Sequence, residues 1–198
     1  LAELEERVGE PLGRRFDLIA GTSVGGLLAM ALAFEVPMAE IVKLFVERGE
    51  DVFSSRRLPG GAVTRLIDLT RSVLGPKYTG EALRRELARH MGQKTLADAL
   101  HAVVVPAVDV SRSVTKVFKT PHAQASLGDE SLSAVDVTLA TCAAPAFFPC
   151  VQVGSTLYAD GGLFAVAPDQ VALHEAEHFM GAKPSRVRML SVGTATMG

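Results

Sequence analysis

The stretch Gly21-Thr22-Ser23-Val24-Gly25 places a serine between glycines. It fits G-x-S-x-G, a nucleophile elbow in which a tight turn between strand and helix presents the serine hydroxyl at the carboxyl edge of a sheet. The N–H of Val24 would then point at the position where an ester oxygen gains negative charge. The pattern predicts acyl-transfer chemistry at Ser23, the alternative being a tight turn that needs small residues and has no catalytic role.

Two other glycine-rich sites do not fit the same residues. A phosphate-binding loop of the form G-x-x-x-x-G-K-[ST] needs a lysine after its second glycine, whereas Leu27 follows Gly26. A dinucleotide fingerprint needs a G-x-G, which this stretch does not contain. Of these three kinds of site, the residues therefore fit only the nucleophile elbow, which predicts acyl-transfer chemistry.

A serine hydroxyl is a weak nucleophile until a base accepts its proton. Asp160, followed by Gly161 and Gly162, comes directly after a predicted strand, and the two glycines would leave its carboxylate unobstructed. The alternative is an ordinary Asp-Gly turn. A conventional triad would add a histidine, and His174 and His178 both follow Asp160 in the expected chain order.

The same two histidines belong to a second motif, because His174-Glu175-Ala176-Glu177-His178 matches H-E-x-x-H. On a helix they would share one face and could bind zinc, with Glu175 as base. A zinc site needs a third protein ligand, and no His, Asp, Glu or Cys follows His178. We therefore expect a polar helix face, no metal and no cofactor, and keep a zinc hydrolase as the lesser alternative.

Composition limits the class of protein. The 198 residues are 48% hydrophobic and 21% charged, as in an ordinary globular domain. A net charge of −2 without a long basic run argues against nucleic acid polymers as partners. Two cysteines, Cys142 and Cys150, do not make a disulfide framework and favour a reducing, cytoplasmic compartment. No apolar run approaches the roughly 20 residues that span a bilayer.

Strands and helices are predicted to alternate, which indicates an α/β fold with a largely parallel sheet. Pro106 lies within one predicted strand and argues for a bulge or an edge position there. Residues 56–76 are basic and amphipathic, and predict either a solvated helix or a lipid-facing flap. The predicted strands are 16–20, 102–110, 114–119, 151–158 and 187–192, and the predicted helices are 27–34, one opened by Pro37, one capped by Thr79 and ending near Gly92, 134–144 and 169–180.

Three stretches together resemble the patatin-like phospholipases: FDLIAGTSVGGLLAMALA at 16–33, ATCAAPAFFP at 140–149 and YADGGLFAVAP at 158–168. The resemblance implies a three-layer α/β sandwich with a mainly parallel central sheet. It implies a Ser-Asp dyad without a metal, in which Ser23 is the nucleophile and Asp160 its base. The implied reaction is hydrolysis of glycerolipid esters through an acyl-serine intermediate.

The sequence departs from the family's pattern in two places. The family carries a glycine-rich D-G-G-G-x-R-G stretch after its first strand, and its N–H groups complete the oxyanion hole; no such stretch precedes Leu1. We therefore expect residues 1–198 to be a single catalytic domain that lacks this strand and loop and keeps only the Val24 donor. Many members also carry asparagine where this chain has Val166.

The resemblance predicts a lipid acyl hydrolase of the phospholipase A or lysophospholipase type, with a phospholipid as substrate. The membrane would be a peripheral partner, reached through residues 56–74 and through Phe147 and Phe148, which in the alternative are core residues. Some bacterial members resemble this chain in the elbow region and act as effectors of antiviral defence that cyclic nucleotides activate, so such an activator is a further hypothesis. A catalytically inactive scaffold that binds lipid or a partner is the main alternative.

Overall fold

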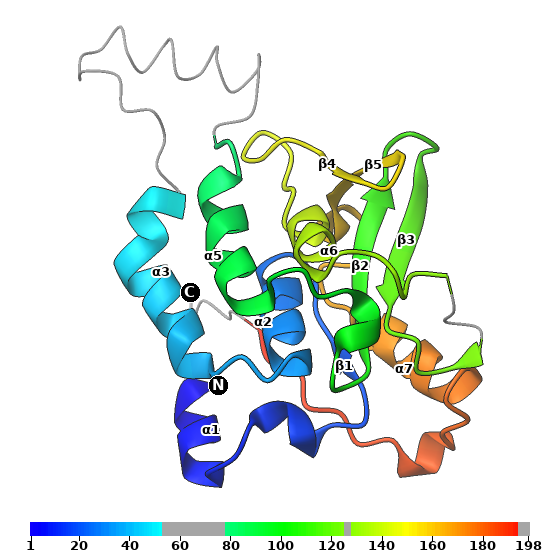
Figure 1. Ribbon diagram of the computed structural model, residues 1–198. Helices are drawn as coiled ribbons and strands as arrows, with labels where there is room; N and C mark the ends of the chain where they lie inside the picture. Colours follow the sequence, from blue (N-terminus) through cyan, green and yellow to red (C-terminus); the bar gives the residue numbers. More distant parts are fainter. Residues whose placement is uncertain (53–77, 125–127, 194–198) are drawn as a thin grey trace, which may run out of the picture.

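A computed structural model describes residues 1–52, 78–124 and 128–193 (Figure 1). The basic segment 56–76 lies outside the described residues. The described elements are α1 (Ala2–Val8), η1 (Leu12–Arg15), β1 (Ile19–Ala20), α2 (Val24–Ala33), α3 (Met38–Val52), α5 (Glu81–Met91), η2 (Leu96–Asp98), β2 (Val103–Asp109), β3 (Val114–Lys119), α6 (Ala134–Thr141), β4 (Val151–Val153), β5 (Thr156–Asp160), η4 (Gly161–Leu163), α7 (Asp169–His178) and η5 (Pro184–Arg186).

Strand β2 is the centre of the sheet. Antiparallel β3 pairs along one edge of β2, from Val104 to Asp109. Parallel β1 pairs with residues 103–104 and antiparallel β5 with residues 107–109, so both must share the other edge. The α/β class is confirmed, and the parallel pairing expected for the serine-bearing strand is that of β1 with β2. The other three described pairings are antiparallel. Short turns join β2 to β3 and β4 to β5 and so account for two of them, and the third pairs β5 with β2.

Helices cover both faces of this sheet. Val105 and its register partner Phe118 belong to the main hydrophobic core, which α2, α3, α5 and α6 also form. Their neighbours Val104 and Lys119 face the opposite way, because side chains alternate along a strand. Lys119 Nζ lies 2.5 Å from a carboxylate oxygen of Glu175 on α7, so α7 covers that second face. The three expected layers are therefore present (Figure 1).

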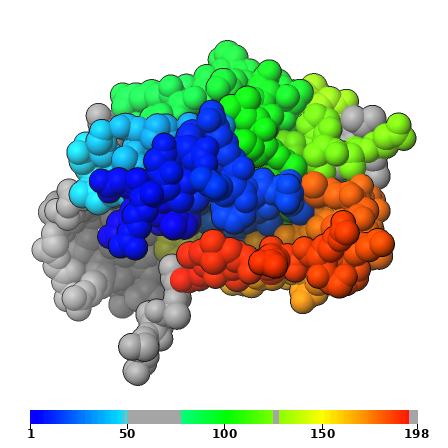
Figure 2. Space-filling model, turned by 90° about the horizontal axis from the view of Figure 1, so that it is seen from below, coloured from blue at the N-terminus to red at the C-terminus, as the bar shows by residue number. Residues whose placement is uncertain are grey.

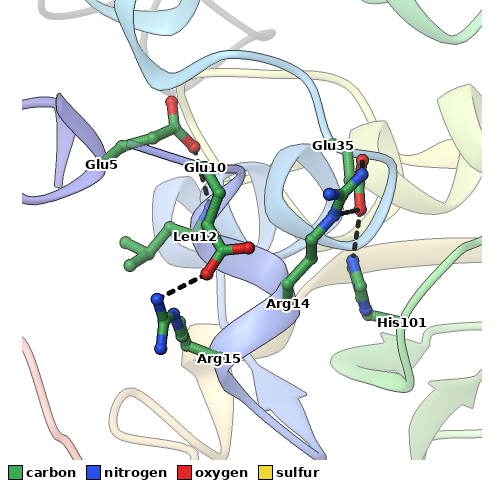
Figure 3. A network of polar contacts seen from close by, with 7 residues as sticks. All are labelled: Glu5, Glu10, Leu12, Arg14, Arg15, Glu35 and His101. Carbon is green, nitrogen blue, oxygen red and sulfur yellow. Dashed lines mark hydrogen bonds and ion pairs between the residues drawn. The ribbon is translucent and has the colours of Figure 1, made fainter. Parts of the chain in front are cut away.

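A polar network fixes the end of α2 that lies away from Ser23 (Figure 3). Arg14 of η1 donates to both carboxylate oxygens of Glu35, at 2.7 and 2.9 Å. His101 Nε2 lies 3.0 Å from the same carboxylate. Glu35 directly follows the C-cap of α2, and His101 precedes β2, so the network ties η1, α2 and the start of the central strand together.

The expected strand at 187–192 is wrong for the residues that the structure describes. None of residues 187–193 is in a strand, and 188–193 are exposed. These residues nevertheless run along the same side of the molecule as the N-terminal residues, as Figure 2 shows in red and blue. A strand exists only with a hydrogen-bonded neighbour, which the apolar pattern of VRMLSV alone cannot supply.

Candidate active site

Ser23 sits on a tight turn between β1 and α2. Its backbone has φ 57° and ψ −127°, a positive φ that few residues other than glycine adopt. Such a conformation typically costs about 1–3 kcal/mol and persists where the surrounding structure holds it. The turn has the strand-to-helix arrangement of a nucleophile elbow, which lifts the serine hydroxyl above the end of the sheet.

The candidate dyad lies where the C-terminal ends of β1 and β5 come close to each other along one edge of β2. Ala20 at the end of β1 pairs with Val104, and Asp160 at the end of β5 pairs with Ala107. Pro106 lies in the gap between them, on the edge that it shares with Val104. Gly21 donates to the Val104 carbonyl at this edge. The backbone nitrogen of Pro106, two residues further along β2, points to the same edge. Proline has no N–H to donate there, and neither β1 nor β5 pairs with β2 at this position.

This explains how a proline fits inside the central strand. The sequence predicted a bulge or an edge, whereas Pro106 is in regular register with Val117 of β3 on its other side. Gly161 packs over the same place, since a Cβ there would lie 2.2 Å from the Pro106 carbonyl oxygen. Pro106 and Gly161 therefore let the two strand ends come together.

Ser23 and Asp160 are in direct contact although they are 137 residues apart in sequence. The Ser23 hydroxyl donates to Asp160 Oδ2 at 2.6 Å. The other carboxylate oxygen, Oδ1, accepts the Gly162 N–H at 2.7 Å, which orients the side chain. Asp160 is only 4% exposed. A carboxylate in this position can accept the serine proton, because it lies within hydrogen-bond reach of the hydroxyl.

Val24 offers an oxyanion donor. It is the first residue of α2, so its N–H has no acceptor within the helix. The positive end of the helix dipole lies at the same place and favours negative charge there. The Val24 N–H could therefore act as one of the donors that a tetrahedral intermediate needs.

An apolar pocket of about 340 Å³ opens at Ser23. Helices α2, α3 and α5 line it together with residues 142–148. Leu44, Phe45 and Leu83 form part of its wall, and so do Phe147 and Phe148. Phe147 is 51% exposed and Phe148 is half-buried, and both rings lie against Tyr78. The volume is in the range of sites for small apolar ligands, about 300–1,000 Å³.

Cys142 lies beside the serine and is not a competing nucleophile. Burial raises the pKa of its thiol far above the ordinary value, and the negative charge of Asp160 acts in the same direction. It therefore stays protonated and can donate, and its Sγ lies 3.1 Å from the Ser23 carbonyl oxygen. Cys150, the other free cysteine, is exposed.

The H-E-x-x-H motif lies on α7, across the sheet from α2. The rings of His174 and His178 are 4.4 Å apart, as expected for neighbours on one helix face. Glu175, the residue that would act as base, is buried and pairs with Lys119 and His122. Among the described residues no three His, Cys, Asp or Glu side chains gather as metal ligands. This part of the structure gives the zinc alternative no support.

Comparison with known proteins places the chain in a family. A family model described as Patatin-like phospholipase matches residues 1–173. A "cGAMP-activated phospholipase" of Pseudomonas aeruginosa is 41% identical over 100% of this chain and 58% of its own length. Proteins of the same name from Vibrio cholerae and Escherichia coli are 35% and 34% identical, over 98% and 92% of this chain and 59% and 51% of their own lengths. The chain thus spans a little over half of the length of these relatives.

No described helix is long and apolar enough to cross a membrane.

Proposed function

Because the chain belongs to the patatin-like phospholipase family, we propose that it hydrolyses acyl esters of glycerolipids, with Ser23 as nucleophile and Asp160 as general base. The observation that carries the proposal is the hydrogen bond of 2.6 Å from the Ser23 hydroxyl to the Asp160 carboxylate. Family membership supplies the substrate class, and this contact supplies the chemistry.

The reaction would proceed in two steps. Asp160 takes the proton of the Ser23 hydroxyl while the Ser23 oxygen attacks the ester carbonyl. The Val24 N–H stabilises the oxyanion that forms. Collapse of this intermediate breaks the ester bond, and the proton passes from Asp160 to the leaving alcohol. Asp160 then takes a proton from water, which attacks the acyl-serine. Collapse of this second intermediate breaks the bond to the Ser23 oxygen, which takes the proton back from Asp160, and the fatty acid is released.

The apolar pocket would hold the acyl chain of the substrate. It opens at the nucleophile, and its walls are leucine and phenylalanine side chains that match a hydrocarbon rather than a charged head group. Burial of each methylene contributes about 0.8 kcal/mol, so the pocket would favour substrates whose chain fills it. A lipid acyl ester is therefore a better match than a small polar ester.

Two further parts of the proposal concern the whole protein. The remaining oxyanion donors would come from a glycine-rich segment outside residues 1–198. The names of the relatives support activation by cGAMP. The role that we propose for the whole protein is that of a bacterial defence effector that works from the cytoplasm at the surface of the inner membrane.

Fluorophosphonate labelling, read by intact mass, tests the dyad directly. We expect one adduct on the wild-type chain, no adduct on Ser23→Ala, and a labelling rate at least about 10²-fold lower for Asp160→Asn, since general-base catalysis contributes roughly 10²–10⁴-fold. Release of fatty acid from phosphatidylglycerol vesicles should fall in the same variants.

Asp136→Asn is the matched control. Asp136 lies on α6 and pairs with Arg84, so its loss disturbs an ion pair without touching Ser23. It should label at the wild-type rate. An adduct that persists in Ser23→Ala would mean that another residue is the nucleophile and would overturn the assignment of Ser23. A folded wild-type protein that neither labels nor hydrolyses lipid, even with sequence added upstream, would favour the inactive scaffold instead.

A further inference from the structure

Thr141, the last residue of α6, and Cys142, the C-cap of that helix, both bind the backbone of Ser23. The Ser23 N–H donates to Thr141 Oγ1 at 3.0 Å. The thiol of Cys142 donates to the Ser23 carbonyl oxygen at 3.1 Å. The same carbonyl also accepts the Leu27 N–H of α2 at 3.1 Å, so it keeps a partner if the thiol is removed. For the N–H of Ser23 the described partner is Thr141.

Thr141 connects the elbow to the central strand. Its hydroxyl donates to the Pro106 carbonyl at 2.7 Å, and because a hydroxyl has one hydrogen, its oxygen is the acceptor for the Ser23 N–H. Thr141 is fully buried. Gly26 makes room for it, since a Cβ at residue 26 would lie 2.5 Å from the Thr141 methyl carbon. At the gap between β1 and β5 the Pro106 carbonyl faces no strand, and the Thr141 hydroxyl supplies the hydrogen bond that a strand would otherwise donate.

The same segment also holds the other member of the dyad. Two residues beyond Thr141, the carbonyl of Ala143 accepts the N–H of Asp160 at 3.0 Å. One short piece of chain is therefore hydrogen-bonded to the backbone of both Ser23 and Asp160. This piece fixes the distance between two residues that otherwise belong to different strands.

We infer that Thr141 is a positioning residue of the dyad, which holds Ser23 in its positive-φ conformation and so keeps the hydroxyl on the Asp160 carboxylate. The inference rests on the proposed function. Valine has nearly the shape of threonine but lacks the hydroxyl, so Thr141→Val removes both hydrogen bonds with little change in volume. The turn would then relax, and a misplacement of about 1 Å can lower the rate roughly 10²-fold.

Thr138 provides a matched control on the same helix. It lies three residues before Thr141, is also fully buried, and its hydroxyl donates to Ala134 within α6 rather than to the elbow. We expect Thr141→Val to lower the rate of fluorophosphonate labelling and kcat about 10²-fold, with little change in KM. Thr138→Val should leave the labelling rate and kcat within about threefold of the wild-type values. Thr141→Ser keeps the hydroxyl and should therefore retain most of the wild-type labelling rate and kcat.

Amide hydrogen exchange supplies a readout that does not need activity. In Thr141→Val the Ser23 N–H should lose protection, whereas in Thr138→Val it should not. Equal labelling rates in the two valine variants, or unchanged Ser23 protection in Thr141→Val, would overturn the inference. If the wild-type chain does not label even with sequence added upstream, the proposed function fails, and the exchange measurement still decides whether Thr141 positions the elbow.

Discussion

At the scale of single residues, the two glycines of the G-x-S-x-G pattern differ in the space that surrounds them. A Cβ on Gly21 would lie 2.0 Å from the Gly25 carbonyl oxygen and 2.8 Å from the Ala29 Cβ. A Cβ on Gly25 would meet no described atom within 4 Å. The first glycine is therefore required by the close approach of β1 to α2, whereas the fold has no steric need for the second.

Alanine substitutions at these positions should separate the two roles. We expect Gly21→Ala to lower the free energy of unfolding by roughly 3 kcal/mol, the upper end of the usual overpacking range, because the clash is with backbone. Gly25→Ala should be neutral or stabilising, since alanine is favoured over glycine in a helix by about 1 kcal/mol. Thermal and urea unfolding of the purified variants would measure both values. Equal losses in the two variants would contradict this assignment.

The contact between Ser23 and Asp160 was predictable at this scale, and the residues that support it were not. Ser23 and Asp160 each carry a local signature of glycines after a strand, and resemblance to a family joined them. Thr141 has no such signature, because a threonine near the end of a helix is common. Its role depends on the gap at Pro106, which arises only when β1 and β5 meet on one edge of β2.

At the scale of elements, α3 and α5 form part of the wall of the pocket. Apolar spacing predicted both helices, and Gly92 ends α5 as expected, although its N-cap is Gly80 rather than Thr79. The spacing could not show which apolar residues face a cavity and which face the core. Leu83 lines the pocket, whereas Leu87, one turn further along α5, is not among its described lining residues.

The different positions of Leu83 and Leu87 give a test of the acyl-chain preference that follows from the proposed hydrolase activity. Leu83→Phe should shorten the space for an acyl chain and shift kcat/KM from p-nitrophenyl palmitate towards the butyrate ester by at least about tenfold, since a pocket discriminates about 10–200-fold per methylene. Leu87→Phe overpacks the same helix and should lower Tm without changing this ratio. An unchanged ratio in Leu83→Phe would place the acyl chain elsewhere.

Several strands also differ from their predicted extents, for physical reasons. The predicted strand at 151–158 is a hairpin, β4 and β5, in which Gly154 turns the chain with φ 60°. The strand predicted over 16–20 is paired only at Ile19 and Ala20. Hydrophobicity marks residues that can be buried in a sheet, and the neighbours present decide how many of them pair.

At the scale of the whole molecule, one edge of β1 faces a groove of about 830 Å³. Residues 15–18 and Ala20 line it together with residues 186–192 and with several residues of α7 and its flanks. Ile19 and Gly21 donate their N–H groups to β2, so the N–H of Ala20 between them points towards the opposite edge. Nearby, the buried hydroxyl oxygen of Thr22 has no partner among the described residues.

These features predict that, in a chain extended upstream of Leu1, a further strand adds along β1 and brings the remaining oxyanion donors to Ser23. A chain extended upstream should label with fluorophosphonate about 10²–10³-fold faster than residues 1–198, the usual effect of one such donor. Amide hydrogen exchange would locate the cause. The Ala20 N–H should become protected in the extended chain, whereas the Ile19 N–H, already bonded to the Ala102 carbonyl at 2.9 Å, should change little. Faster labelling without protection of Ala20 would mean that the added segment acts from another side of the site, and unchanged labelling would mean that it supplies no oxyanion donor.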